Sequence, residues 1–162
     1  MRKIKLNTDG NTRKHGGGGG FGGLFRVESG AWISGYYGRL EICTCLETKL
    51  WAVYKGLTII LQRGFNEVII ETDAEQVMKL LSEDLGEKCP YRDIVEDARI
   101  IMRGCDCSTQ HIRREANICV DAMAKLSEYQ PASLLIVNEP LAELRPLIVA
   151  NIAHLSQESG RM

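Results

Sequence analysis

Three aspartates stand at places in this chain where acidic side chains could act together. Asp9 follows a short alternating segment, Asp73 follows the apolar run of residues 68–72, and Asp121 lies in a later helical segment. Carboxylates at the ends of neighbouring strands converge on the crevice where ligands bind in α/β folds. Magnesium takes oxygen ligands, and paired magnesium ions stabilise both reacting oxygens at a phosphodiester. Singly, each aspartate could merely cap its element; together they predict a metal site.

The segments that carry these aspartates predict an α/β domain. Alternation and turn residues predict a strand over residues 3–10, a hairpin over 23–38 and a helix over 46–63 that Gly64 ends. The pattern then predicts strand 66–73, helix 74–84, helix 93–104, strand 107–115 and helix 116–129. An antiparallel meander followed by crossover units gives one mixed sheet with helices on its faces.

The glycine-rich segment HGGGGGFGG, residues 15–23, is of low complexity. We expect it to be a flexible turn leading into the second strand, where glycine permits close approach of a backbone. Its spacing formally matches a dinucleotide fingerprint. A strand follows it, however, and such a site requires the N-terminus of a helix.

The pattern changes after Pro131, and this change suggests a boundary. We predict a domain over residues 3–128 and a C-terminal appendage over residues 129–162. The appendage is expected to be partly helical, over about residues 139–155, with a disordered end.

Blocks of this sequence resemble, in order, the ribonuclease H type 1 family. They are LNTDGN, LWAVYKGLTIILQRGFNEVIIETDAEQV and REANICVDAMAKLS. They are most similar to the ribonuclease-H-like domains of plants, many of them derived from retroelements. The resemblance implies a ribonuclease-H-like fold with a five-stranded mixed sheet, three antiparallel strands and then two parallel ones, flanked by helices. It also implies cleavage of RNA–DNA hybrids with magnesium, or manganese, as the metal.

The same resemblance implies four catalytic acids, of which this chain has three. Asp9, Asp73 and Asp121 match three catalytic and metal-ligating positions. The family's glutamate directly precedes a Leu-Trp-Ala segment, which here is residues 50–52. Lys49 therefore stands at the glutamate position.

Glu47 lies two residues before Lys49, which on a helix is a rotation of roughly 200°. We therefore expect Lys49 to face the aspartates and Glu47 to point away. A local unwinding at the helix start is the alternative that would bring Glu47 to the site. An ammonium group beside the aspartates would repel a divalent ion, whereas a Lys49 that turned to solvent would leave the site one ligand short. Both arrangements predict weakened metal binding and impaired hydrolysis.

Basic and polar residues near position 115 are candidates for nucleic-acid contact. Arg113 and Arg114 could touch phosphates, although a solvated strand end is an equal alternative. Asn117 matches the family's REAN block and is assigned to the same nucleic-acid surface. His111 lies within the preceding strand, and we expect a structural, sheet-facing role for it.

Composition limits the remaining choices. The chain has 162 residues, a net charge of −1, no apolar run long enough to cross a membrane, and six cysteines. We expect a monomer in the cytoplasm or nucleus, where the cysteines are free thiols. The near-zero net charge gives no general attraction to nucleic acid, although a local basic surface remains compatible with it.

Three functions fit these observations. The first is a ribonuclease-H-like domain that binds nucleic acid with impaired hydrolysis. The second is an active magnesium-dependent hybrid ribonuclease that uses Glu47. The third is a non-catalytic domain that binds a protein partner, with the segment after Pro131 as its contact element.

Overall fold

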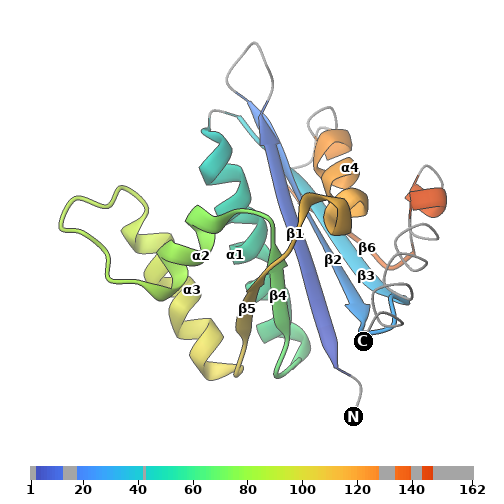
Figure 1. The fold of residues 1–162 in the computed structure, drawn as a ribbon, viewed down its shortest axis with the longest axis horizontal. Helices are drawn as coiled ribbons and strands as arrows, with labels where there is room; N and C mark the ends of the chain where they lie inside the picture. The colour runs from blue at the N-terminus through green and yellow to red at the C-terminus, as the bar shows by residue number, and fades with distance from the viewer. Residues whose placement is uncertain (1–2, 13–17, 42, 128–133, 140–143, 148–162) are drawn as a thin grey trace.

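The computed structural model describes residues 3–12, 18–41, 43–127, 134–139 and 144–147. Within them lie the strands β1 (Ile4–Thr12), β2 (Gly19–Val27), β3 (Trp32–Leu40), β4 (Ile69–Thr72), β5 (Ser108–His111) and β6 (Leu135–Val137). They form one mixed sheet in the order β5-β4-β1-β2-β3-β6 (Figure 1). Strands β1, β2 and β3 pair antiparallel, whereas β4 and β5 run parallel to β1. The mixed sheet expected from the sequence is therefore present.

Helices cover both faces of this sheet. They are α1 (Cys45–Arg63), α2 (Glu75–Ser82), α3 (Arg92–Gly104) and α4 (Ile118–Ser127), the last preceded by a 3-10 turn, η1 (Arg114–Asn117). Figure 1 shows α1, α2 and α3 together on one side of the sheet and α4 on the other. None of the helices in the described part of the chain is long and apolar enough to span a membrane.

The ends of α1 are fixed by capping residues. The Thr44 side chain accepts a hydrogen bond from the Glu47 backbone N–H, and the Glu47 carboxylate accepts one from the Thr44 N–H. This capping box satisfies two N–H groups that a helix start would otherwise leave unpaired. At the other end Gly64 has a left-handed backbone with φ of 69°, a conformation that glycine adopts without strain. The helix register, and with it the direction in which Lys49 points, is therefore set.

Two clusters of buried apolar residues hold the layers together. The larger lies between the sheet and α1, α2 and α3, with Leu6, Phe25, Leu57 and Ile70 among its fully buried members. The smaller lies under α4 and contains Leu24, Cys119, Met123 and Leu144. Because α4 packs against β1 and β2, the smaller cluster fixes the helix that carries Asp121.

The glycine-rich segment is not a flexible turn throughout, because its second half is strand. β2 begins at Gly19, and β1 continues past Gly10 to Thr12 to pair with it. Close packing explains the glycines: a Cβ atom on Gly23 would overlap the ring of the buried Tyr36. Tertiary packing, rather than β-propensity, thus decides the structure here.

Gly23→Ala is expected to lower the free energy of unfolding by about 1–3 kcal/mol, because the added methyl group overlaps Tyr36. Urea denaturation would measure this loss. Gly86→Ala is the matched control, since a Cβ there meets nothing within 4 Å, and its effect should stay within about 0.5 kcal/mol. Equal effects at the two positions would contradict the packing explanation.

The sheet has six described strands rather than the five expected, and the sixth comes from the segment predicted to be an appendage. β6 pairs antiparallel with β3, with Val137 opposite Gly35. The indole N–H of Trp32 donates to the Asn138 carbonyl at 3.1 Å. Leu144, 1% exposed, is buried in the cluster under α4. Part of this segment thus packs on the sheet, and the boundary at residue 128 stays a prediction.

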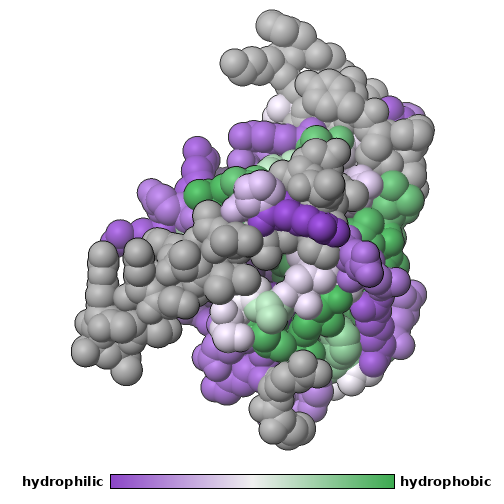
Figure 2. Space-filling view, turned by 90° about the vertical axis from the view of Figure 1, so that its right-hand side faces the viewer, coloured by the Kyte–Doolittle hydropathy of each residue, from purple (hydrophilic) through white to green (hydrophobic). Residues whose placement is uncertain are grey.

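The helix expected over about residues 139–155 falls mostly outside the described residues. Figure 2 views the molecule from the side that carries α4 and shows apolar surface there. The exposed large apolar side chains on this side lie on α4 and β6. They are Ile118, Leu126, Leu135 and Ile136.

Candidate functional site

The three aspartates predicted from the sequence come from β1, from the end of β4 and from α4. The parallel pairing of β1 with β4 ends where Thr8 lies opposite Thr72. Asp9 directly follows Thr8, and Asp73 directly follows Thr72. β4 has therefore ended where β1 reaches Asp9. Side chains from both faces of the sheet can therefore meet at this point.

Lys49 reaches into this gap from the start of α1. Its Nζ atom lies 2.6 Å from Oδ1 of Asp9 and 3.5 Å from Oδ1 of Asp73. The Lys49 side chain is 17% exposed, against 3% for Asp9 and 9% for Asp73. One partly buried ammonium group thus links two buried carboxylates.

Glu47 does not take part in this cluster. Its carboxylate accepts a hydrogen bond from the Thr44 N–H at 3.2 Å, as part of the capping box. The helix keeps a regular start, so the unwinding that would have brought Glu47 to the aspartates is not seen. Lys49, and not Glu47, faces Asp9 and Asp73, as expected from the sequence.

The local charges determine the ionisation of this cluster. Burial raises the pKa of the Asp9 carboxyl to about 6, with the nearby Lys49 acting in the opposite direction. Burial also acts to lower the pKa of Lys49, but Asp9 and Asp73 outweigh it, so that this pKa is raised above its ordinary value. At pH 7 Lys49 is therefore an ammonium and Asp9 a carboxylate, and the two form an ion pair.

Asp121 completes the group of carboxylates from the opposite face of the sheet. It forms an ion pair with Lys125, at 2.9 Å, and accepts a hydrogen bond from the Asn11 side chain at 3.2 Å. Burial acts to raise the pKa of Asp121, but its interactions with Lys125 and Asn11 outweigh burial, so that this pKa is lowered. Asp121 is thus ionised at pH 7, and its hydrogen bond from Asn11 joins it to β1, the strand that carries Asp9.

These residues do not fit a divalent metal ion as they are arranged. Among the described residues, no three His, Cys, Asp or Glu side chains are grouped so as to hold a metal. Oδ2 of Asp73 is buried without a hydrogen-bond partner in the described structure, but Oδ1 of both Asp9 and Asp73 contacts the Lys49 ammonium. A cation introduced there would face this fixed positive charge. The metal-ligand role expected for Asp9, Asp73 and Asp121 thus requires Lys49 to be displaced.

A buried polar network lies beneath the cluster. Arg26 of β2 donates to Oε1 of Glu71 at 2.6 Å and to Oδ1 of Asn7 at 2.7 Å. Asn7 in turn donates to Glu71 at 3.1 Å and to Asn117 at 3.3 Å. Asn7 and Glu71 each stand two residues before a site aspartate, and Asn117 stands four residues before Asp121. The network therefore ties together the three elements that carry the carboxylates.

Asn117 is a correction to the sequence-based assignment. It is 1% exposed, and its amide donates to the Thr8 carbonyl at 2.9 Å while accepting from Asn7. Both polar atoms of its side chain are used inside the protein. A direct contact with nucleic acid, as predicted for it, is therefore not what the structure supports.

A surface cavity of about 430 Å³ opens beside Lys49 and Asp73, and His111 lines it together with Cys45 and Glu75. His111 is exposed rather than packed against the sheet, and its Nε2 lies 3.2 Å from the Asp73 carbonyl oxygen. The sequence did not single out His111 for this place. A parallel pairing of residues 69–72 with residues 108–111 places His111 opposite Thr72, next to Asp73. Predicting that pairing would have placed His111 beside the site.

The two arginines predicted to touch phosphates follow β5 closely. Nε of Arg114 lies 3.9 Å from Oδ2 of Asp73, and the Arg114 side chain is 85% exposed. Arg113 is likewise exposed. Both guanidinium groups are therefore accessible to a ligand at the edge of the site.

Comparison with known proteins gives consistent results. The model of the family described as reverse transcriptase-like matches residues 7–127. An Arabidopsis thaliana protein named as a putative ribonuclease H protein is 29% identical over 122 residues, which are 75% of this chain and 20% of that protein. The chain thus spans about a fifth of the length of this relative.

Solved structures share the fold. Ribonuclease H1 of the archaeon Halobacterium salinarum has a TM-score of 0.70 at 22% identity, over 77% of this chain and 96% of that one. LC11-RNase H1, solved with an RNA/DNA hybrid and isolated from compost, has a TM-score of 0.69 at 20% identity, over the same shares of the two chains. The mixed sheet and helices described above therefore form a ribonuclease-H-like fold.

Proposed function

Because the chain belongs to the reverse-transcriptase-like family of ribonuclease-H-like domains, we propose that it binds RNA–DNA hybrids and hydrolyses them poorly or not at all. The observation that carries this proposal is the ion pairing of Lys49 with Asp9 and Asp73, at 2.6 and 3.5 Å. The ammonium group stands among the carboxylates that the family resemblance assigns to metal binding. In this chain the positive charge at the site comes from the protein itself.

The proposed binding follows from the same charges. Lys49 neutralises part of the negative charge of the aspartates, which would otherwise repel a phosphate backbone. Arg113 and Arg114 stand exposed just after β5, with Nε of Arg114 3.9 Å from Asp73, and guanidinium groups can form paired hydrogen bonds with phosphate. The hybrid-bound structure of LC11-RNase H1 shares this fold and supports a hybrid as the ligand to test first.

Hybrid binding is expected to persist when divalent metal is removed with EDTA, because Lys49 already supplies the cation at the site. Fluorescence anisotropy with a labelled RNA–DNA hybrid would measure the dissociation constant with and without Mg²⁺. Binding should weaken as salt rises, since each phosphate contact releases a counterion. A dissociation constant that rises sharply in EDTA would contradict the proposal.

The same anisotropy assay can measure the contribution of Arg113 and Arg114 to hybrid binding. Replacing Arg113 and Arg114 by alanine should reduce the slope of log affinity against log salt by about 2, or about 1 for each phosphate that an arginine neutralises. Arg92→Ala is the matched control, because Arg92 is an arginine of α3 paired with Glu96. It should leave the slope unchanged. An unchanged slope in the double variant would remove Arg113 and Arg114 from the proposed surface.

A further inference from the structure

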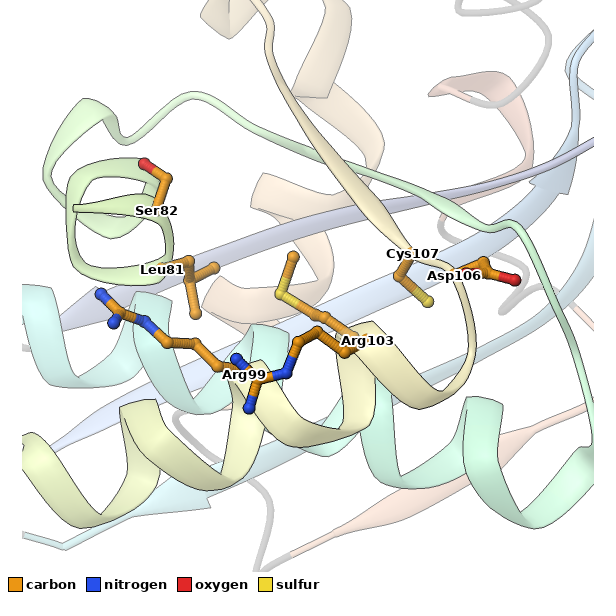
Figure 3. A pocket seen from close by; sticks show the side chains of 7 residues that line it. Leu81, Ser82, Arg99, Arg103, Asp106 and Cys107 are labelled. Carbon is orange, nitrogen blue, oxygen red and sulfur yellow. The ribbon is translucent and has the colours of Figure 1, made fainter. Parts of the chain in front are cut away.

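A second cavity, of about 500 Å³, lies between the end of α2, the helix α3 and the turn before β5 (Figure 3). None of the residues that line it lines the cavity beside Lys49. Cys107 borders it just before β5, whereas His111 at the end of β5 borders the first cavity. Cys107 and His111 are four positions apart along extended chain, or about 13 Å. The second cavity is therefore separate from the cavity beside Lys49.

Two arginines of α3 supply positive charge to this cavity. Arg99 and Arg103 are four residues apart on the helix, so they share one face, where like charges destabilise each other. Arg103 is exposed and has no hydrogen-bond or ion-pair partner for its side chain within the described residues. Figure 3 shows the two side chains extending to the same side of α3.

Only some of the hydrogen-bond donors of the Arg99 guanidinium group have acceptors in the described structure. Its Nη2 donates to the carbonyl oxygens of Leu80 and Glu83, so it caps the end of α2. Its Nε is buried and has no acceptor in the described structure. A buried charged donor without an acceptor is unfavourable, and an acceptor in the cavity would relieve this.

The other lining groups do not cancel the positive charge. Burial raises the pKa of the Cys107 thiol to about 11, so the thiol is neutral at pH 7. The Asp106 side chain is exposed and points away from both arginines (Figure 3). Leu81 and Met102 contribute apolar surface, beside which charge interactions are strengthened.

We propose that the Arg99–Arg103 cavity binds a phosphate group. Guanidinium groups donate in a planar fork that matches the oxygens of phosphate, and the cavity has the volume of small-molecule sites. The phosphate could belong to a nucleic-acid strand or to a free phosphate compound, which share this chemistry. The site is additional to the proposed hybrid surface, and it uses none of the residues of that surface.

The test is a titration of ¹⁵N-labelled protein followed by amide chemical shifts of residues 99–107. Inorganic phosphate and a short single-stranded RNA are the two probes. Arg103→Ala should weaken binding of the probe about tenfold or more, because a charge-assisted hydrogen bond is lost. It should leave thermal stability nearly unchanged, since the Arg103 side chain is exposed and unpaired within the described residues. Arg92→Ala removes the same charge from the same helix outside the cavity, and should change the affinity less than twofold.

Each outcome bears on the proposal. Binding of both probes, with RNA displacing phosphate, supports the site with a nucleic-acid strand as the source. Binding of phosphate alone supports it with a free phosphate compound as the source. The proposal is overturned if neither probe shifts these amides, or if Arg92→Ala weakens binding as much as Arg103→Ala. Lys49→Met should not alter either titration, so a failure of the hybrid proposal stays distinguishable from a failure of this one.

Discussion

Replacing Lys49 by glutamate is expected to give a domain that binds Mg²⁺ or Mn²⁺ and cleaves RNA–DNA hybrids measurably. The change removes an ammonium group that lies 2.6 Å from Asp9 and 3.5 Å from Asp73. Unit charges at about 4 Å interact by roughly 4 kcal/mol in a partly solvated site, and a divalent ion doubles this. The new carboxylate also adds an oxygen ligand. Metal affinity should rise about 10- to 100-fold, and the rate of hydrolysis should rise with it.

Three further variants separate the causes. Lys49→Met removes the charge without adding a ligand, so it should recover only part of the metal affinity. Asp121→Asn, added to Lys49→Glu, should remove the gain in hydrolysis if Asp121 serves the same metals. Glu47→Gln keeps a side-chain oxygen for the capping box at the start of α1, so it should change stability by less than about 0.5 kcal/mol and leave metal binding unchanged.

Calorimetric titration with Mn²⁺ and cleavage of a labelled hybrid would follow these variants in parallel. The proposal fails if the unmodified chain cuts hybrids strongly with Mg²⁺, loses that activity with Glu47→Gln and is unaffected by changes at Lys49. Tight metal binding by Lys49→Glu without cleavage would be a different result. It would support the electrostatic argument and show that the rest of the cleft is not competent for hydrolysis.

The direction of Lys49 was predictable from the family resemblance, because the match of residues 50–52 places Lys49 at the family's glutamate position. Glu47 lies two residues away on the same helix and therefore on another face. The structural role of Glu47 was also present in the sequence, since Thr44 three residues before a glutamate is the pattern of a capping box. Where an interaction is made within one or two turns of a helix, the residue types alone determine it.

Other features of the site could not be predicted, because they depend on residues that are distant in the sequence. The hydrogen bond between Asn7 and Asn117 joins residues 110 apart, and that between Arg26 and Glu71 joins residues 45 apart. Nothing near Asn117 indicates that β1 will cover it. The glycines of β2 were expected to form a flexible turn leading into the strand, and the groups that crowd them come from distant segments, with Tyr36 at Gly23 and Met123 at Gly22.

Arg26→Met is expected to cause a larger loss of stability than any other single change proposed for this domain. The Arg26 and Glu71 side chains are 3% and 5% exposed, with Nη2 and Oε1 at 2.6 Å. Removing the arginine leaves the Glu71 carboxylate buried with Lys5 at 3.7 Å and the amide of Asn7 as its remaining partners. Breaking a buried ion pair from one side costs about 3–5 kcal/mol. This is a large share of the roughly 5–15 kcal/mol by which such domains are stable.

Urea denaturation of Arg26→Met, Glu71→Met and the double variant would measure the loss and the coupling between the two residues. The double variant should be more stable than the sum of the single losses predicts, because it leaves no unpaired buried charge. If one single variant is too unstable to fold while the double variant folds, that result by itself shows the coupling. Arg92→Met is the control: it breaks the Arg92–Glu96 pair, whose side chains are 38% and 54% exposed, and should cost less than about 1 kcal/mol. If the single losses simply add, the Arg26–Glu71 pair contributes no coupling, and the network beneath the aspartates does not act as a unit.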